Sequence, residues 1–157
     1  MSAITALTLT DKAWQEISLH AIETFPEECC GVILYSGKTD EVRRCGNIQN
    51  ALHALDAGSY PRDATIAYAM DPKEIDSIIQ EAEAAGASIK AFYHSHPNHE
   101  AYFSQEDKAF ASPFGEPSYP ESAQIVISIY DRVVKRIAAY VWAQDKKDFV
   151  EIPVRKL

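Results

Sequence analysis

Apolar residues near the start of the chain recur first at strand spacing, then at helix spacing, and then at strand spacing again. Residues 4–9 are predicted as a strand, and residues 11–24 as a helix with its apolar side chains on one face. Beyond the Phe-Pro pair at residues 25–26, two further strands are predicted at residues 32–35 and 41–45. The Ser-Gly turn between them makes these two strands a hairpin.

The most regular helix pattern begins after Asp71. This residue is predicted as the N-cap, Pro72 occupies the first helical position, and Glu74 completes a capping box. Gly86 is predicted to end the helix. Between these signals, one apolar stripe at helical spacing is formed by Ile75, Ile78, Ile79 and Ala82. The helix is therefore expected to pack on the core.

The rest of the chain alternates strands with loops and one short helix. Residues 46–63 have weak periodicity and several breakers, which predicts a long surface loop. A short helix begins at Ser104, prolines mark a loop at residues 113–120, and residues 130–133 are predicted as a tight turn. Strands are predicted at residues 65–70, 88–93, 124–130 and 133–142. This interleaving of strands and helices predicts an α/β fold.

Size and composition fit one domain spanning residues 1–157. The 157 residues are 46% hydrophobic and 24% charged, which allows a sizeable core. The net charge of −8 disfavours nucleic acid, which binds clustered basic faces, and better suits a partner with a basic surface. No apolar stretch reaches the length of a membrane span, and the start of the chain lacks the features of a signal peptide. We therefore expect a cytoplasmic protein that binds neither nucleic acid nor membrane.

The three cysteines, Cys29, Cys30 and Cys45, are an odd number without CxxC spacing. This pattern disfavours a disulfide framework or a zinc site of four cysteines. Reduced, partly buried thiols are the favoured interpretation.

Candidate chemistry concentrates around the end of the strand at residues 88–93. His94 and His96 stand two residues apart, so their side chains point to the same face of the strand. Ser104 and Asp107 have capping-box spacing, and the loop before them is long enough to fold this turn back over the histidines. Two nitrogens and one oxygen would suit zinc with its fourth position open for water, as in catalytic sites. Each part alone is common as a surface histidine or a simple helix cap, but the combination favours a metal site.

A zinc hydrolase also needs a base that takes the proton from the attacking water. The candidate is Glu28, shortly before the strand that starts at Val32, and its neighbour Glu27 is the rival on composition alone. Without the histidines, either glutamate would be interpreted as a surface acid at the end of a helix.

Together these residues resemble the JAMM (MPN+) zinc metallopeptidases, which include the prokaryotic JAB proteins. The family pattern is a glutamate shortly before a Cys-Gly pair, then H-[ST]-H-P, then S-x-x-D. This chain has Glu28 before Cys30-Gly31, then His94-Ser95-His96-Pro97, and then Ser104 with Asp107. The separation of His96 and Asp107 by ten residues also matches. Residue identity, order and spacing agree over most of the chain, which makes the resemblance specific.

The resemblance implies a cytidine deaminase-like α/β fold, with a mixed β-sheet flanked by helices. It implies that His94, His96 and Asp107 bind Zn²⁺, and that a zinc-activated water attacks an amide or isopeptide carbonyl. Glu28 would act as general base and then as acid to the leaving amine, and Ser104 would help to hold the oxyanion. The family spacing to the Cys-Gly pair favours Glu28 over its neighbour.

The resemblance also implies a substrate class. Short bacterial-type members act on ubiquitin-like or sulfur-carrier proteins, or trim adducts from their C-termini, and residues 94–104 look most like that subgroup. A deubiquitinase-like isopeptidase acting on other conjugates, and a metal-free MPN scaffold that only binds, stay open as alternatives. A nucleobase deaminase of the same fold is disfavoured because the chain lacks H-x-E and P-C-x-x-C segments. The oligomeric state is not predicted.

An extended, glycine-ending tail of such a substrate would bind to a sheet edge or an ordered loop. Residues 46–63 and 112–122 are the candidate clamps, with ordinary connecting loops as the equal alternative. His99 and Tyr102 lie near the predicted metal, where a solvated loop position is favoured over substrate contact for both.

Overall fold

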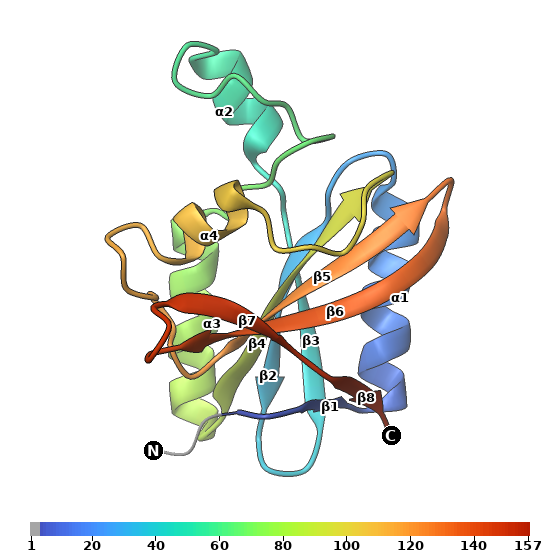
Figure 1. The fold of residues 1–157 in the computed structure, drawn as a ribbon, viewed down its shortest axis with the longest axis vertical. Coiled ribbons are helices and arrows are strands. Elements are labelled where there is room, and N and C mark those ends of the chain that lie inside the picture. The colour runs from blue at the N-terminus through green and yellow to red at the C-terminus, as the bar shows by residue number, and fades with distance from the viewer. Residues whose placement is uncertain (1–3) are drawn as a thin grey trace.

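The computed structural model describes residues 4–157 and shows a central β-sheet with helices packed around it (Figure 1). The helices are α1 (Asp11–Thr24), α2 (Gln49–Leu55), α3 (Pro72–Ala85) and α4 (Gln105–Ala111). The strands are β1 (Leu7–Leu9), β2 (Cys30–Tyr35), β3 (Asp40–Cys45), β4 (Ser88–Pro97), β5 (Ala123–Tyr130), β6 (Val133–Ala143), β7 (Asp148–Ile152) and β8 (Val154–Lys156). None of the described helices is both long enough and apolar enough to cross a membrane.

Six strands form one mixed sheet in the order β3-β2-β4-β5-β6-β7. Within it β4 and β5 are parallel, and every other neighbouring pair is antiparallel. β1 pairs separately with β8 in parallel, so segments from near both ends of the chain lie side by side. The predicted α/β fold, with a mixed sheet flanked by helices, is therefore confirmed.

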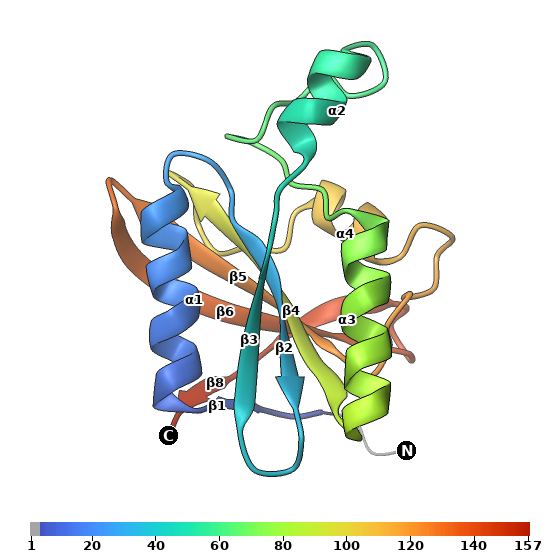
Figure 2. The same cartoon turned by 180° about the vertical axis from the view of Figure 1, so that it is seen from behind.

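Alternation along the strands assigns α1 and α3 to opposite faces of the sheet. Ile33 and Tyr93 belong to a core cluster that includes Ile17 of α1. Their chain neighbours Val32 and Phe92 belong to a second cluster with residues of α3. Figure 2 shows the two helices on either side of β2 and β3. The central strands are consequently buried on both faces, as the continuous burial of β2 and β5 shows.

Local patterns predicted the main helices well. α1 spans the predicted residues, and the side chain of Thr10 caps its first turn. α3 has Asp71 as N-cap and Pro72 at its first position, and Gly86 ends it in the left-handed conformation, with φ of 69°. The predicted turn at residues 130–133 is present, with positive φ at its two central residues.

Two predictions for the middle of the chain were wrong. Residues 46–63 are not one loop, because Gln49–Leu55 form α2; this helix buries no apolar stripe and so leaves no periodic pattern. Residues 65–70 are not a strand, because the backbone groups of Ala67 and Ala69 bind the side chain of Asn47, and Met70 forms only an isolated bridge with Asn47. Figure 1 shows α2 projecting from the body of the protein. We refer to residues 46–70 as the arm.

Two smaller differences also come from tertiary contacts. Glu74 does not complete the predicted capping box with Asp71, because its carboxylate accepts the N–H of Gly46 at 3.0 Å. The first strand is shorter than residues 4–9, since only Leu7–Leu9 pair with β8. β7 and β8 themselves were not predicted.

Candidate metal centre

β4 carries both predicted histidine ligands into the interior, between β2 and β5. His94 and His96 share one face of the strand because they stand two residues apart. Ser95 points to the opposite face, where its hydroxyl accepts the N–H of Cys29 at 2.8 Å. The middle residue of the motif therefore ties β4 to the segment that carries Glu28.

The side chains of His94, His96 and Asp107 meet in a buried triangle of donor atoms. The Nε2 atoms of the two histidines lie 3.2 Å apart, and each lies 3.2 Å from a different carboxylate oxygen of Asp107. In a tetrahedral zinc site, ligand atoms about 2.0–2.1 Å from the metal stand about 3.3–3.4 Å from one another. The spacing and chemistry of these donors therefore fit a divalent metal ion such as Zn²⁺.

A backbone carbonyl and a tyrosine hold the two imidazoles in place. Nδ1 of His96 lies 2.9 Å from the carbonyl oxygen of Glu100. Because a carbonyl only accepts, this contact places the proton on Nδ1 and leaves the Nε2 lone pair for a metal. The ring of Tyr68 stacks on His94, with centroids 4.3 Å apart and planes at 22°. Tyr68 therefore restricts the orientation of the His94 ring.

The first turn of α4 holds the carboxylate of Asp107. Ser104 Oγ accepts the N–H of Asp107 at 3.0 Å, and the N–H of Ser104 donates to Asp107 Oδ2 at 3.0 Å. The predicted capping box is therefore present. Because the same carboxylate faces the histidines, one local cap orients the third donor.

Burial and neighbouring charges determine the protonation of these groups. Burial lowers the pKa of His94. Burial also acts to lower the pKa of His96, but the hydrogen bond and charge of Asp107 outweigh it, and that pKa is raised. For Asp107, burial opposes ionisation, yet the two histidines hold its pKa well below the usual range. Asp107 is therefore ionised at neutral pH, as a metal ligand must be.

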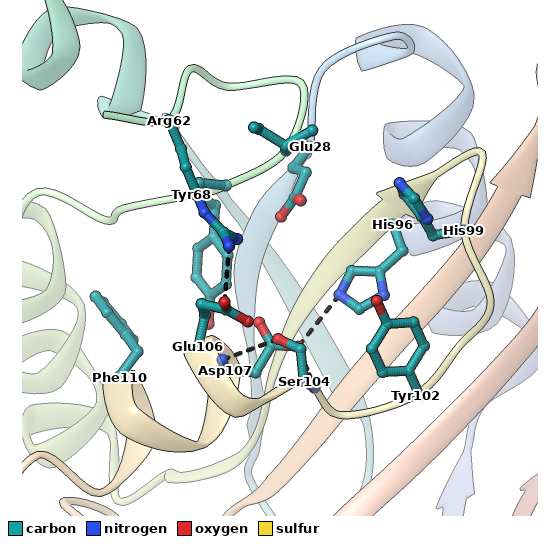
Figure 3. Close-up of a pocket in the computed structure, with 12 residues that line it drawn as sticks. Glu28, Arg62, Tyr68, His96, His99, Tyr102, Ser104, Glu106, Asp107 and Phe110 are labelled. Carbon is teal, nitrogen blue, oxygen red and sulfur yellow. Dashed lines mark hydrogen bonds and ion pairs between the residues drawn. The ribbon is translucent and has the colours of Figure 1, made fainter. Parts of the chain in front are cut away.

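Glu28 points into the same pocket from the side opposite α4 (Figure 3). Its side chain is buried, and its backbone N–H donates to the carbonyl of Ala64 at 2.7 Å. Burial raises the pKa of Glu28 to about 8, and the charge of His96 opposes this rise. Glu27 is only partly buried, and its carboxylate accepts a hydrogen bond from Asn50. Of the two glutamates, only Glu28 is among the described residues that line the pocket, where it is joined by His96 and Asp107.

The pocket has a volume of about 500 Å³ and is lined by the arm, the loop after β4, and α4. Of the two predicted clamps, residues 46–63 contribute Arg62, whereas residues 112–122 contribute no lining residue. His99 and Tyr102 both line the pocket. The lining residues that the sequence analysis missed are Ile66, Ala67, Tyr68, Glu106 and Phe110. Nothing in the local pattern around the first three indicates a site, because the alternation of residues 65–70 resembles that of a strand.

Packing explains the glycine in the Cys-Gly pair that follows Glu28. A Cβ atom on Gly31 would overlap the ring of Tyr93 on the neighbouring strand β4. The hydroxyl end of that ring, which lies over Gly31, is held in place because Oη of Tyr93 lies 2.7 Å from Nδ1 of His20 on α1. The cysteines are all free and buried: Cys29, Cys30 and Cys45.

Known proteins with similar sequences match most of this chain. The family described as prokaryotic homologs of the JAB domain matches residues 10–146. A desampylase from Haloferax volcanii is 33% identical over 110 residues, which cover 68% of this chain and 73% of that protein.

Solved structures with the same fold extend over nearly the whole chain. A protein from Desulfitobacterium hafniense superposes with a TM-score of 0.70 at 24% identity, covering 96% of this chain and 92% of the other. A JAB1/MPN domain protein from Archaeoglobus fulgidus gives a TM-score of 0.51 at 16% identity, covering 95% and 99%. At these identities, the structural likeness supports the fold alone.

Proposed function

We propose that this chain, which belongs to the family of prokaryotic homologs of the JAB domain, is a zinc-dependent peptidase acting on a ubiquitin-like or sulfur-carrier protein. The bond cleaved is an amide at the C-terminus of that protein. The observation that carries this proposal is the buried triangle of two imidazole nitrogens and a carboxylate, with Glu28 directed into the same pocket. The name of the Haloferax volcanii relative, a desampylase, supports a ubiquitin-like modifier as the substrate.

The metal would be held by Nε2 of His94, Nε2 of His96 and the carboxylate of Asp107. When bound there, Zn²⁺ supplies Lewis-acid chemistry, activating water and polarising the carbonyl of the substrate. The interactions that orient the ligands, from Glu100 to His96 and from Ser104 to Asp107, keep the donors in position for it.

Glu28 and Ser104 carry the remaining chemistry of amide hydrolysis. Glu28 accepts a proton from the attacking water and passes it to the leaving amine nitrogen. A buried carboxyl with a pKa of about 8 can both take up and release a proton near neutral pH. Ser104 Oγ accepts the N–H of Asp107, which leaves its own hydrogen free to be donated to the substrate oxygen that becomes negative.

Metal analysis combined with a cleavage assay tests the proposal. The purified protein should contain one zinc per chain and should release a fusion from the C-terminus of a ubiquitin-like carrier, followed by mass spectrometry. His96→Ala and Asp107→Ala should lose most of the zinc, because two ligands cannot keep the open tetrahedral site. Full zinc retention in both variants would refute the ligand assignment.

The same assay separates the alternatives. Cleavage of lysine-linked conjugates, with linear fusions left intact, would favour a deubiquitinase-like isopeptidase. A protein that binds carrier but contains no zinc and cleaves nothing would instead be a scaffold.

A further inference from the structure

Arg62, on the arm, is the one lysine or arginine among the described residues that line the pocket. Its Nη2 donates to Oε1 of Glu106 at 2.7 Å, an ion pair that joins the arm to α4 (Figure 3). The backbone carbonyl of Arg62 accepts a hydrogen bond from Gln49 at 2.9 Å, which fixes the point where this side chain leaves the arm. The arm thereby presents a permanent cation to a pocket whose other ionisable lining groups are acids, histidines and tyrosines.

The ion pair is suited to exchange with another anion. The side chains of Arg62 and Glu106 are 44% and 57% exposed, and ion pairs this exposed add little to stability. A guanidinium can bind a carboxylate through two parallel N–H groups, whereas Glu106 receives a single hydrogen bond. A carboxylate on a bound substrate can therefore replace Glu106 with little loss.

The location of Arg62 indicates which substrate group it can reach. Arg62 and Glu28 both line this pocket, and Figure 3 shows their side chains extending into it from the arm and from the segment before β2. An anion held by Arg62 therefore lies near the amide on which Glu28 acts.

We propose that Arg62 binds the free α-carboxylate of a C-terminal amino acid that is removed from the carrier protein, and that Glu106 occupies the guanidinium when no substrate is bound. This inference rests on the proposed function and narrows its substrate class. Hydrolysis adds one water and releases the carrier carboxylate and the free amino acid. An isopeptide to a lysine side chain has no carboxylate next to the scissile nitrogen, so Arg62 does not assist its binding.

Matched peptides isolate the charge that Arg62 recognises. Fluorescent peptides ending in Gly-Gly-Ala are prepared as the free acid and as the carboxamide, which differ only at that group. For the zinc-loaded protein, KM for the acid should be about 10-fold lower than for the carboxamide. Arg62→Gln should abolish this preference. Glu106→Gln, which frees the guanidinium, should strengthen it by about 2–5-fold.

Opposite effects of Arg62→Gln and Glu106→Gln would show that Arg62 binds substrate. If the ion pair only held the arm in place, either substitution would break it and both would have the same effect. Arg43→Gln is the control. It breaks the exposed ion pair between Arg43 and Glu81, which lies outside the pocket, and should leave the preference unchanged. A rise in KM for the acid on Glu106→Gln would overturn the proposal.

Binding to Glu28→Gln, measured by fluorescence anisotropy, gives a readout that does not depend on cleavage. The acid should bind about 10-fold more tightly than the carboxamide, and adding Arg62→Gln should remove the difference. Equal binding of the two peptides would overturn the carboxylate site even if the wild type cleaves both. Selective binding without any cleavage by the wild type would support the site and refute the proposed function.

Discussion

Replacing Glu28 with Gln should stabilise the metal-free protein while removing its activity. Glu28 is 6% exposed, and burial raises its pKa from 4.5 to about 8. Between these two pH values the folded state binds more protons than the unfolded state, so folding stability falls as the pH rises. Gln keeps the size of the side chain and has no carboxyl group to ionise.

The two pKa values determine the size of the effect. At about 1.36 kcal/mol per pH unit, the wild type should be less stable than Glu28→Gln by about 4 kcal/mol at pH 8. At pH 5 most of the folded-state carboxyl is still protonated, and the difference should shrink to about 1 kcal/mol. The advantage of the variant therefore grows as the pH rises from 4.5 toward 8.

Urea unfolding of chelator-treated proteins at about pH 5 and about pH 8 measures this difference. On zinc-loaded samples, Glu28→Gln should keep its zinc and cleave about 10²-fold more slowly, in line with loss of a general acid-base group. Glu27→Gln makes the same chemical change one residue away and should alter neither stability nor rate. If Glu28→Gln gained no stability at the higher pH, or cleaved at the wild-type rate, its assignment as the buried base would be refuted.

Three further substitutions test packing and orientation around the site. Gly31→Ala should lower the unfolding free energy by about 1–3 kcal/mol, because the added methyl group overlaps the ring of Tyr93. Gly46→Ala, where a Cβ atom meets nothing within 4 Å, is its control in urea unfolding, and equal losses would contradict the overlap. Tyr68→Leu should weaken zinc binding about 10-fold in competition with a chromogenic chelator, because it removes the ring stacked on a ligand. Tyr68→Phe should restore the affinity, and failure to do so would assign the effect to the hydroxyl. Ser104→Ala should keep the zinc, slow cleavage about 10²-fold or more, and cost about 1 kcal/mol of stability as a lost cap. An unchanged cleavage rate would leave Ser104 with the capping role alone.

Local patterns in the sequence determined the main elements of this protein and the geometry of its three candidate metal donors. Caps, breakers and apolar spacing act within a few residues, which is why α1, α3 and the β2-β3 hairpin were predictable. The positions of the three candidate donors also depend on local patterns. His94 and His96 share a face because of the two-residue period of a strand, and Asp107 is oriented by the cap of its own helix.

Tertiary structure alone decided what surrounds those donors. The strand-like alternation of residues 65–70 did not produce a strand, because the side chain of Asn47, distant in sequence, binds the backbone of Ala67 and Ala69. That placement brings Tyr68 onto His94 and Arg62 opposite α4, contacts that link residues more than twenty positions apart. Such contacts depend on how separate elements pack against one another, and no spacing within a single segment encodes them.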